Sequence, residues 1–239
     1  MPWLIAHYQP VGLFSLKHGE ATSTGGKSLL IPTPFSIRTA LVDAALRVEG
    51  HRRAESIVEI IKTLTLALKP ADYAAVSALF TKVLKPERSD GARDRFFQKT
   101  IAFREYIHWW GSLGVALEGE EKALQRVIPW LKHVTYFGKR GGLVQLEAEP
   151  MIARNLPDGF VLLRGVDLEE ELPASFTLGL LQRVDEWGPT LSWEHLNVYN
   201  HERRIRVGKE RIRFDVILPY QMTQAGRGFM VYEKTADSN

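Results

Sequence analysis

Residues 33–50 read TPFSIRTALVDAALRVEG, and this stretch carries a complete signal for one helix. Thr33 has a side chain suited to the N-cap, and Pro34 suits the first helical position, where its missing N–H leaves no hydrogen bond unmade. Apolar residues recur at helical spacing from Ile37 to Val48, and Gly50 marks the end. The stretch therefore predicts an amphipathic helix that begins at Pro34 and stops before Gly50.

The flanking segments predict a mixture of strands and helices. Upstream, residues 3–16 indicate a strand, and the glycine-rich stretch 17–28, here called the early loop, indicates a loop. Downstream, the apolar pattern predicts helices over 54–68, 71–84 and 120–131, strands over 103–117 and 143–146, and an exposed loop over 85–94. Short strand-like pieces follow a soft boundary near residue 150. This order favours an α+β fold over a doubly wound parallel sheet.

Composition excludes several classes of protein. The 239 residues are 45% hydrophobic and 25% charged, which is ordinary for a globular chain. No cysteine is present, so thiolate catalysis and cysteine-ligated zinc or iron–sulfur centres are excluded. No apolar run reaches the roughly 18 residues of a membrane span, and the N-terminal residues do not resemble a signal peptide. We therefore expect a cytoplasmic protein that contacts no membrane.

Two glycine-containing segments resemble nucleotide-binding motifs but lack a required glycine, so no cofactor is expected. Gly26-Lys27-Ser28 resembles the end of a phosphate-binding loop, but the glycine required five residues earlier is Ala21. Gly226-Arg227-Gly228 lacks the third glycine of a dinucleotide-binding fingerprint. His195 and His201 form a lone pair without a third ligand, and we predict no metal site.

Basic residues gather in three separate stretches. In residues 201–214, HERRIRVGKERIRF, the alternation predicts a hairpin around Gly208 with one apolar face and one arginine face. Guanidinium forks bind phosphate bidentately, so this face suits nucleic acid. The alternative is a solvated edge hairpin that charge protects from aggregation. The arginine face consists of Arg204, Arg206, Arg211 and Arg213.

The other two stretches combine cations with glycine or aromatic residues. One contains Tyr136, Gly138, Lys139 and Arg140, with Phe137 beside them, and the other contains Lys17, His18, Lys27 and Arg38. Glycine lets backbone N–H groups approach phosphates, and an aromatic ring such as Tyr136, Phe137 or Trp109 can stack on an unpaired base. Together the three stretches predict one surface that follows a single RNA strand.

Three short segments give the chain a family resemblance. They are Ile31-Pro-Thr-Pro-Phe-Ser-Ile-Arg-Thr-Ala40, Phe103-Arg-Glu-Tyr106 leading to Gly114-Val-Ala-Leu117, and the turn Tyr136-Phe-Gly-Lys-Arg140. In this order and spacing they resemble the Cas-five family of the CRISPR-associated RAMP superfamily. The resemblance covers about the first 150 residues. It implies a ferredoxin-like (RRM-like) domain with extra helices over residues 1–150, and a β-rich part over 151–239.

The resemblance also implies a function. It predicts a non-catalytic antiviral-defence subunit that binds the 5′ handle of the crRNA in a type I Cascade complex. The implied partners are the backbone subunit and the large subunit, with target DNA as a further candidate. One alternative is a metal-independent endoribonuclease that processes precursor crRNA, with Tyr8, Lys27 and His18 as imaginable groups. Another is a protein-only assembly module whose basic face binds acidic partners.

Overall fold

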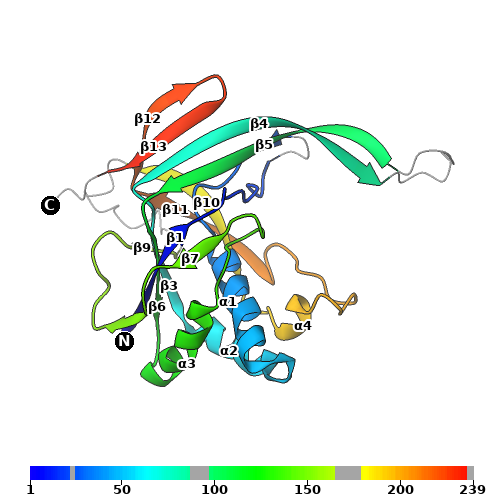
Figure 1. The fold of residues 1–239 in the computed structure, drawn as a ribbon. Coiled ribbons are helices and arrows are strands. Elements are labelled where there is room, and N and C mark those ends of the chain that lie inside the picture. The colour runs from blue at the N-terminus through cyan, green and yellow to red at the C-terminus, as the bar shows by residue number, and fades with distance from the viewer. Residues whose placement is uncertain (22–24, 87–96, 165–178, 236–239) are drawn as a thin grey trace.

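The computed structural model describes residues 1–21, 25–86, 97–164 and 179–235. The first sheet has the order β7-β1-β6-β3-β9, with β8 also pairing to β1, and all its pairings are antiparallel. Its strands are β1 (Trp3–Pro10), β3 (Thr65–Lys69), β6 (Leu113–Glu118), β7 (Val144–Leu146), β8 (Met151–Ala153) and β9 (Val161–Leu162). Figure 1 shows this sheet beside the helices. The predicted α+β class is confirmed.

Helices cover one face of the first sheet. They are α1 (Pro34–Glu49), α2 (Ala54–Thr63) and α3 (Glu121–Lys132), with the short 3-10 turn η1 (His51–Arg53) between α1 and α2; the short α4 (Trp193–Leu196) contacts α2. Leu4, Ala6 and Tyr8 of β1 lie in the same buried cluster as residues of α1, α2 and α3. The Tyr8 hydroxyl donates to the carbonyl of Leu131 at 2.8 Å, which joins β1 to the end of α3. Taken in chain order, β1, α1, β3, β6, α3 and β7 follow the β-α-β-β-α-β arrangement of ferredoxin-like domains.

The predicted start of α1 is confirmed in atomic detail. The Thr33 side chain accepts a hydrogen bond from the backbone N–H of Ser36, and Pro34 occupies the first turn. Gly50 follows the last turn with a φ of 81°, a conformation that favours glycine. Local sequence therefore sets both ends of this helix.

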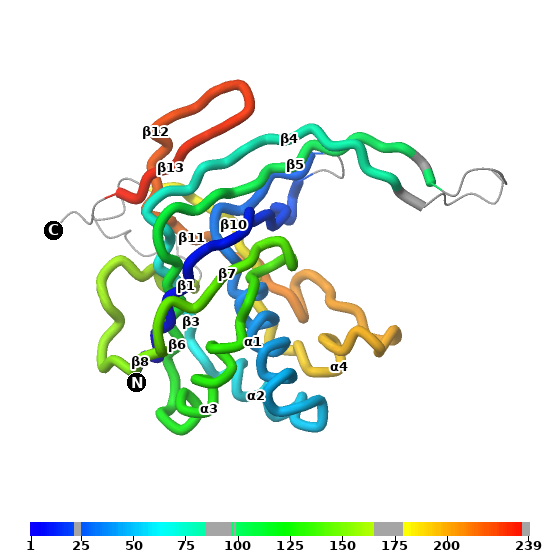
Figure 2. The backbone as a smooth tube through the Cα atoms, viewed as in Figure 1, coloured from blue at the N-terminus to red at the C-terminus, as the bar shows by residue number. Residues whose placement is uncertain are grey.

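A second sheet forms a long arm. Its order is β12-β13-β4-β5-β2, from β2 (Gly25–Gly26), β4 (Tyr73–Pro86), β5 (Phe97–Trp110), β12 (Tyr220–Gly226) and β13 (Phe229–Lys234). Strands β4 and β5 pair along their whole length, from Tyr73 opposite Trp110 to Pro86 opposite Phe97. Figure 2 shows this β4–β5 arm extending well beyond the body of the molecule.

Two helix predictions next to this arm are wrong. The expected helix 54–68 ends at Thr63, and residues 65–69 form β3 in the first sheet. The expected helix 71–84 is strand β4. Short apolar runs fit both helical and strand spacing, and here the aromatic and β-branched residues of β5 provide a strand partner. The predicted loop over 85–94 lies outside the described residues from position 87 onward.

The residues after 150 are distributed over three sheets. Strands β8 and β9 belong to the first sheet, and β13 pairs with β4 of the arm. Strands from both sides of residue 150 therefore share the same sheets. The remaining pair is β10 (Leu180–Trp187) with β11 (Arg211–Leu218), and it packs against α1. The predicted hairpin around Gly208 is wrong, because β11 pairs along its length with β10 and meets residues 204–207 only near Arg211, in an isolated parallel bridge to Val207.

Candidate nucleic-acid interface

The two ends of the early loop are joined by backbone hydrogen bonds. Lys17 and Ser28 form an isolated bridge, and the N–H of His18 donates to the carbonyl of Lys27 at 2.9 Å. The Ser28 N–H donates to the Glu105 carboxylate of β5 at 2.9 Å, which fixes the loop to the arm. Lys17 and Lys27 are both exposed. The loop therefore presents two lysines and one half-buried histidine together.

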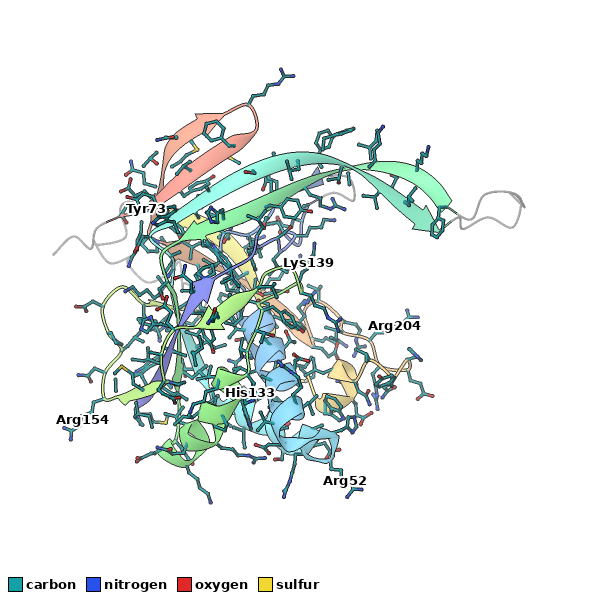
Figure 3. All side chains as sticks on the ribbon, in the orientation of Figure 1. Arg52, Tyr73, His133, Lys139, Arg154 and Arg204 are labelled. Carbon is teal, nitrogen blue, oxygen red and sulfur yellow. The ribbon has the colours of Figure 1, made fainter. Side chains whose placement is uncertain are left out.

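The glycine turn over residues 138–142 lies directly against the start of the early loop. Gly138 adopts a φ of 70°, and a Cβ added there would lie 3.4 Å from the Phe14 ring and 3.6 Å from Leu16. The N–H of Gly142 donates to the carbonyl of Lys139 at 2.8 Å, which closes the turn. Lys139 and Arg140 are exposed at its tip, and Figure 3 shows Lys139 below the arm. Two predicted patches that are more than a hundred residues apart in sequence are therefore neighbours.

Of the four predicted arginines, Arg213 on β11 lies beside the early loop. A Cβ added at Gly19 would lie 2.8 Å from its Nη2 atom, so the guanidinium packs on the bare backbone of this glycine. Nearby, Arg183 binds Glu20 and Asp215, each at 2.9 Å. The hydrogen bond from Arg183 lowers the pKa of Asp215 below its usual value.

The other three arginines of the predicted ribbon do not share this surface. Arg206 donates to the buried carboxylate of Glu210 at 2.8 Å, and Arg211 lies 3.0 Å from Asp185 and 4.1 Å from the Phe35 ring centroid. Hydrogen bonds from Arg206 lower the pKa of Glu210 to about 2. The prediction of one arginine face is wrong. Alternation of residue types indicates a strand, but it does not indicate which strand or which carboxylates lie beside it.

Arg204 lies on the exposed loop that follows α4. Figure 3 labels it on a different part of the molecule from Lys139.

Arg38 is a structural residue, which corrects its predicted role. Its side chain is 10% exposed and donates to Glu186 at 2.9 Å, to the carbonyl of Leu64 at 2.9 Å and to the carbonyl of Ile61. The last two carbonyls lie at the end of α2, where a helix leaves acceptors unpaired. Arg38 therefore ties α1 to α2 and β10, and its guanidinium is buried in the protein instead of facing a phosphate.

Two of the three rings expected to stack on bases are unavailable. Phe137 is 1% exposed and packs edge-on against Tyr8, and Trp109 is 2% exposed and stacks on Phe14 with ring centroids 4.4 Å apart. Tyr136 is half-buried beside the glycine turn. Tyr136 is thus the one ring of this predicted set that remains partly accessible.

The arm supplies aromatic residues that the sequence prediction missed. Phe80 and Phe103 lie directly opposite each other on the face of the arm that continues the core, and each is 55% exposed. Their rings meet edge to face at 5.2 Å, and β2 of the early loop pairs with β5 at Phe103. Lys82 and Lys99 follow on the same face. The sequence signal is the period of two over Phe97, Lys99, Ile101 and Phe103. It was missed because the partner strand over 71–84 was expected to be a helix.

The assembled site consists of the early loop, the glycine turn, Arg213 and the inner face of the arm, and we call it the basic surface. Its cations that form no ion pair with another described residue are Lys17, Lys27, Lys139, Arg140 and Arg213, together with Lys82 and Lys99 on the arm. Unpaired cations can neutralise phosphates, and the exposed aromatic rings beside them can stack on bases.

The residues considered for metal or general acid–base chemistry lie in different environments. Within the described residues, no group of three His, Asp or Glu side chains could hold a metal ion. Tyr8, one of the imagined nuclease groups, is fully buried against α3, whereas His18 lies in the early loop, where its Nδ1 accepts from the N–H of Glu20. In the described part of the chain, no helix is long and apolar enough to cross a membrane.

Comparison with known proteins gives one curated relative. No family model matches the chain. The chain is 24% identical over 108 residues to a protein named CRISPR-associated protein Cas5 from Archaeoglobus fulgidus, and the match covers 45% of this chain and 47% of that protein. The chain thus spans about half the length of the curated relative it matches. The resemblance seen in the short motifs is confirmed as a similarity to this named protein.

Solved structures resemble the chain more loosely. A crystal structure of a CRISPR protein from Archaeoglobus fulgidus covers 99% of this chain and is 12% identical, with a TM-score of 0.45; 93% of that protein is covered. A chain of a CRISPR RNA-guided surveillance complex covers 90% of this chain, with 89% of its own length covered, 12% identity and a TM-score of 0.38.

Proposed function

We propose that this chain is a non-catalytic RNA-binding subunit of a type I CRISPR surveillance complex, and that its basic surface holds the 5′ handle of the crRNA. One observation carries the proposal: the glycine turn and the early loop meet at Leu16 and present unpaired cations together. The curated relative, whose name assigns it to a CRISPR system, supports the same conclusion.

The mechanism is binding without chemistry. Lysines of the early loop and of the glycine turn neutralise successive phosphates, because exposed cations release the counterions that surround a nucleic acid. Gly138 and its neighbours let the backbone approach a phosphate closely. Phe103 and Phe80 lie next to these cations and offer flat apolar surfaces to unpaired bases. The surface therefore favours a single strand over a duplex.

The first test asks which RNA accompanies the protein. We expect the chain, expressed with its CRISPR locus, to co-purify with RNAs that share one repeat-derived 5′ sequence. The double variant Lys139→Ala/Arg140→Ala should lose this RNA, whereas Arg52→Ala, which removes an exposed charge on η1, should retain it. A wild-type chain that co-purifies without RNA, or with RNA of random sequence, contradicts the proposal.

The endoribonuclease alternative has its own test. Such an enzyme cuts repeat RNA without magnesium and depends on a histidine, first of all His18. We expect the wild-type chain and His18→Ala to leave a repeat RNA intact under the same conditions. Cleavage by the wild type that His18→Ala abolishes favours the enzyme instead.

A further inference from the structure

The second sheet exposes a face that points away from the core. Antiparallel partners that lie directly opposite share a face, and residues alternate between faces along each strand. Ala74 and Val76 of β4 are buried, so Tyr73, Ser77 and Leu79 point the other way. This outer face consists of Tyr73, Ala75, Ser77, Leu79, Arg104, Tyr106, His108, Trp110, Phe229, Val231 and Glu233.

Large apolar side chains on this outer face are exposed to solvent. Trp110 is 70% exposed, Phe229 47%, Leu79 46% and Tyr73 40%. Of the six tryptophans, Trp110 alone is among the exposed large hydrophobic residues. Contiguous exposed aromatic surface of this kind marks interaction sites, and Trp and Tyr are the residues that most often anchor protein interfaces.

One corner of the outer face is acidic. The Tyr73 hydroxyl donates to the Glu233 carboxylate at 3.1 Å, and the Asp72 carboxylate lies against Gly111, the residue after Trp110. Neither Asp72 nor Glu233 forms an ion pair with another described residue. We call Asp72, Tyr73, Trp110 and Glu233 the acidic–aromatic corner. Two unpaired carboxylates repel a phosphate chain, so this corner does not suit nucleic acid and suits a cationic side chain instead.

We propose that the outer face docks a second protein subunit, and that this partner places a lysine or arginine in the acidic–aromatic corner. A cation there contacts the Trp110 ring and the two carboxylates, and both interactions strengthen as water is excluded. Apolar side chains of the partner cover Leu79 and Phe229. The inference rests on the proposed function, since it assumes that the chain works inside a complex, but it uses a face distinct from the basic surface.

The absence of cysteine allows a direct test. Ser77→Cys places a single thiol in the middle of the outer face, and Lys122→Cys places a matched exposed thiol on α3. Both variants are co-expressed with the proteins encoded beside this chain, and each purified complex is labelled with a maleimide. We expect assembly to slow labelling of the Ser77→Cys thiol at least tenfold relative to the isolated chain, while the Lys122→Cys thiol keeps its rate.

Two further variants test the chemistry of the contact. Trp110→Ser should reduce the fraction of the chain that enters the complex at least tenfold, and Glu233→Gln should reduce it less. Neither should change the RNA affinity of the isolated chain by more than twofold. If RNA binding is absent but the Ser77→Cys thiol is still protected by assembly, the proposed function fails and the docking proposal stands.

Three results overturn the docking proposal. In the first, the Ser77→Cys thiol labels as fast in the complex as in the isolated chain, or Trp110→Ser assembles normally. In the second, a repeat-derived RNA alone protects the thiol, which assigns the face to nucleic acid. In the third, the wild-type chain forms no complex with any protein encoded beside it.

Discussion

The salt dependence of RNA binding follows from the number of unpaired cations on the basic surface. The early loop, the glycine turn and Arg213, to which we assign the phosphate contacts, supply five: Lys17, Lys27, Lys139, Arg140 and Arg213. Each phosphate neutralised on a single strand contributes about −0.7 to the slope of log K against log salt, so five contacts give about −3.5. Raising salt from about 50 to about 200 mM should therefore weaken binding roughly a hundredfold. Fluorescence anisotropy with a labelled handle oligonucleotide measures the slope.

Removing two cations should change that slope by a calculable amount. Lys139→Ala/Arg140→Ala leaves three contacts, so the slope should become about −2.1 and the loss over the same salt range roughly twentyfold. Arg52→Ala should keep the wild-type slope, because Arg52 lies on η1, and Figure 3 shows Arg52 at the bottom of the molecule, away from Lys139. The reasoning is refuted if the double variant keeps the wild-type slope, or if Arg52→Ala changes it equally.

Three further predictions concern single side chains. Phe103→Ala should weaken RNA binding by about 1–3 kcal/mol through a lost base stack, and Phe229→Ala, an exposed ring on the opposite face, should not; equal losses in anisotropy assays would contradict base stacking. Arg38→Met should cost about 3–5 kcal/mol in urea unfolding, because it strands Glu186 in a largely buried site, and a loss below about 1 kcal/mol would contradict the buried pair. Because Arg206 lowers the pKa of Glu210 from 4.5 to about 2, the carboxylate stabilises the fold above pH 4.5 and loses this effect as pH falls toward 2. Glu210→Gln should therefore melt earlier than wild type at pH 7 and equally at pH 2, and a constant difference at both pH values would argue against the carboxylate.

Local signals in the sequence predicted the elements whose ends are set by local chemistry. Thr33 and Gly50 bound α1 as expected, and the helix over 120–131 lies within one residue of α3. The β4–β5 arm could not be predicted in this way, because its stability depends on pairing between distant strands. The apolar spacing of residues 71–84 is compatible with either a strand or a helix until the partner strand is known.

The sequence predicted which stretches carry positive charge and that they share one surface, but not which of their side chains face it. The sequence predicted basic character for the early loop and for the glycine turn, and folding brings these two together at Leu16. Arg38 carries the same charge, but folding buries it against Glu186, which no composition argument foresees. Phe103 entered the prediction only as part of a family motif, and its exposed ring was not predicted. The face of the arm on which this ring lies is known only once β5 is paired with β4, where Phe103 lies opposite Phe80.

Cross-linking tests the central claim most directly. A handle oligonucleotide that carries 4-thiouridine is bound to the wild-type chain, irradiated and digested, and the linked peptides are identified by mass spectrometry. We predict links in the peptides that carry Lys17 or Lys27, in the glycine turn at 138–142 and around Phe103. Links confined to η1, α2 or the loop bearing Arg204 would contradict the claim that the basic surface holds the RNA.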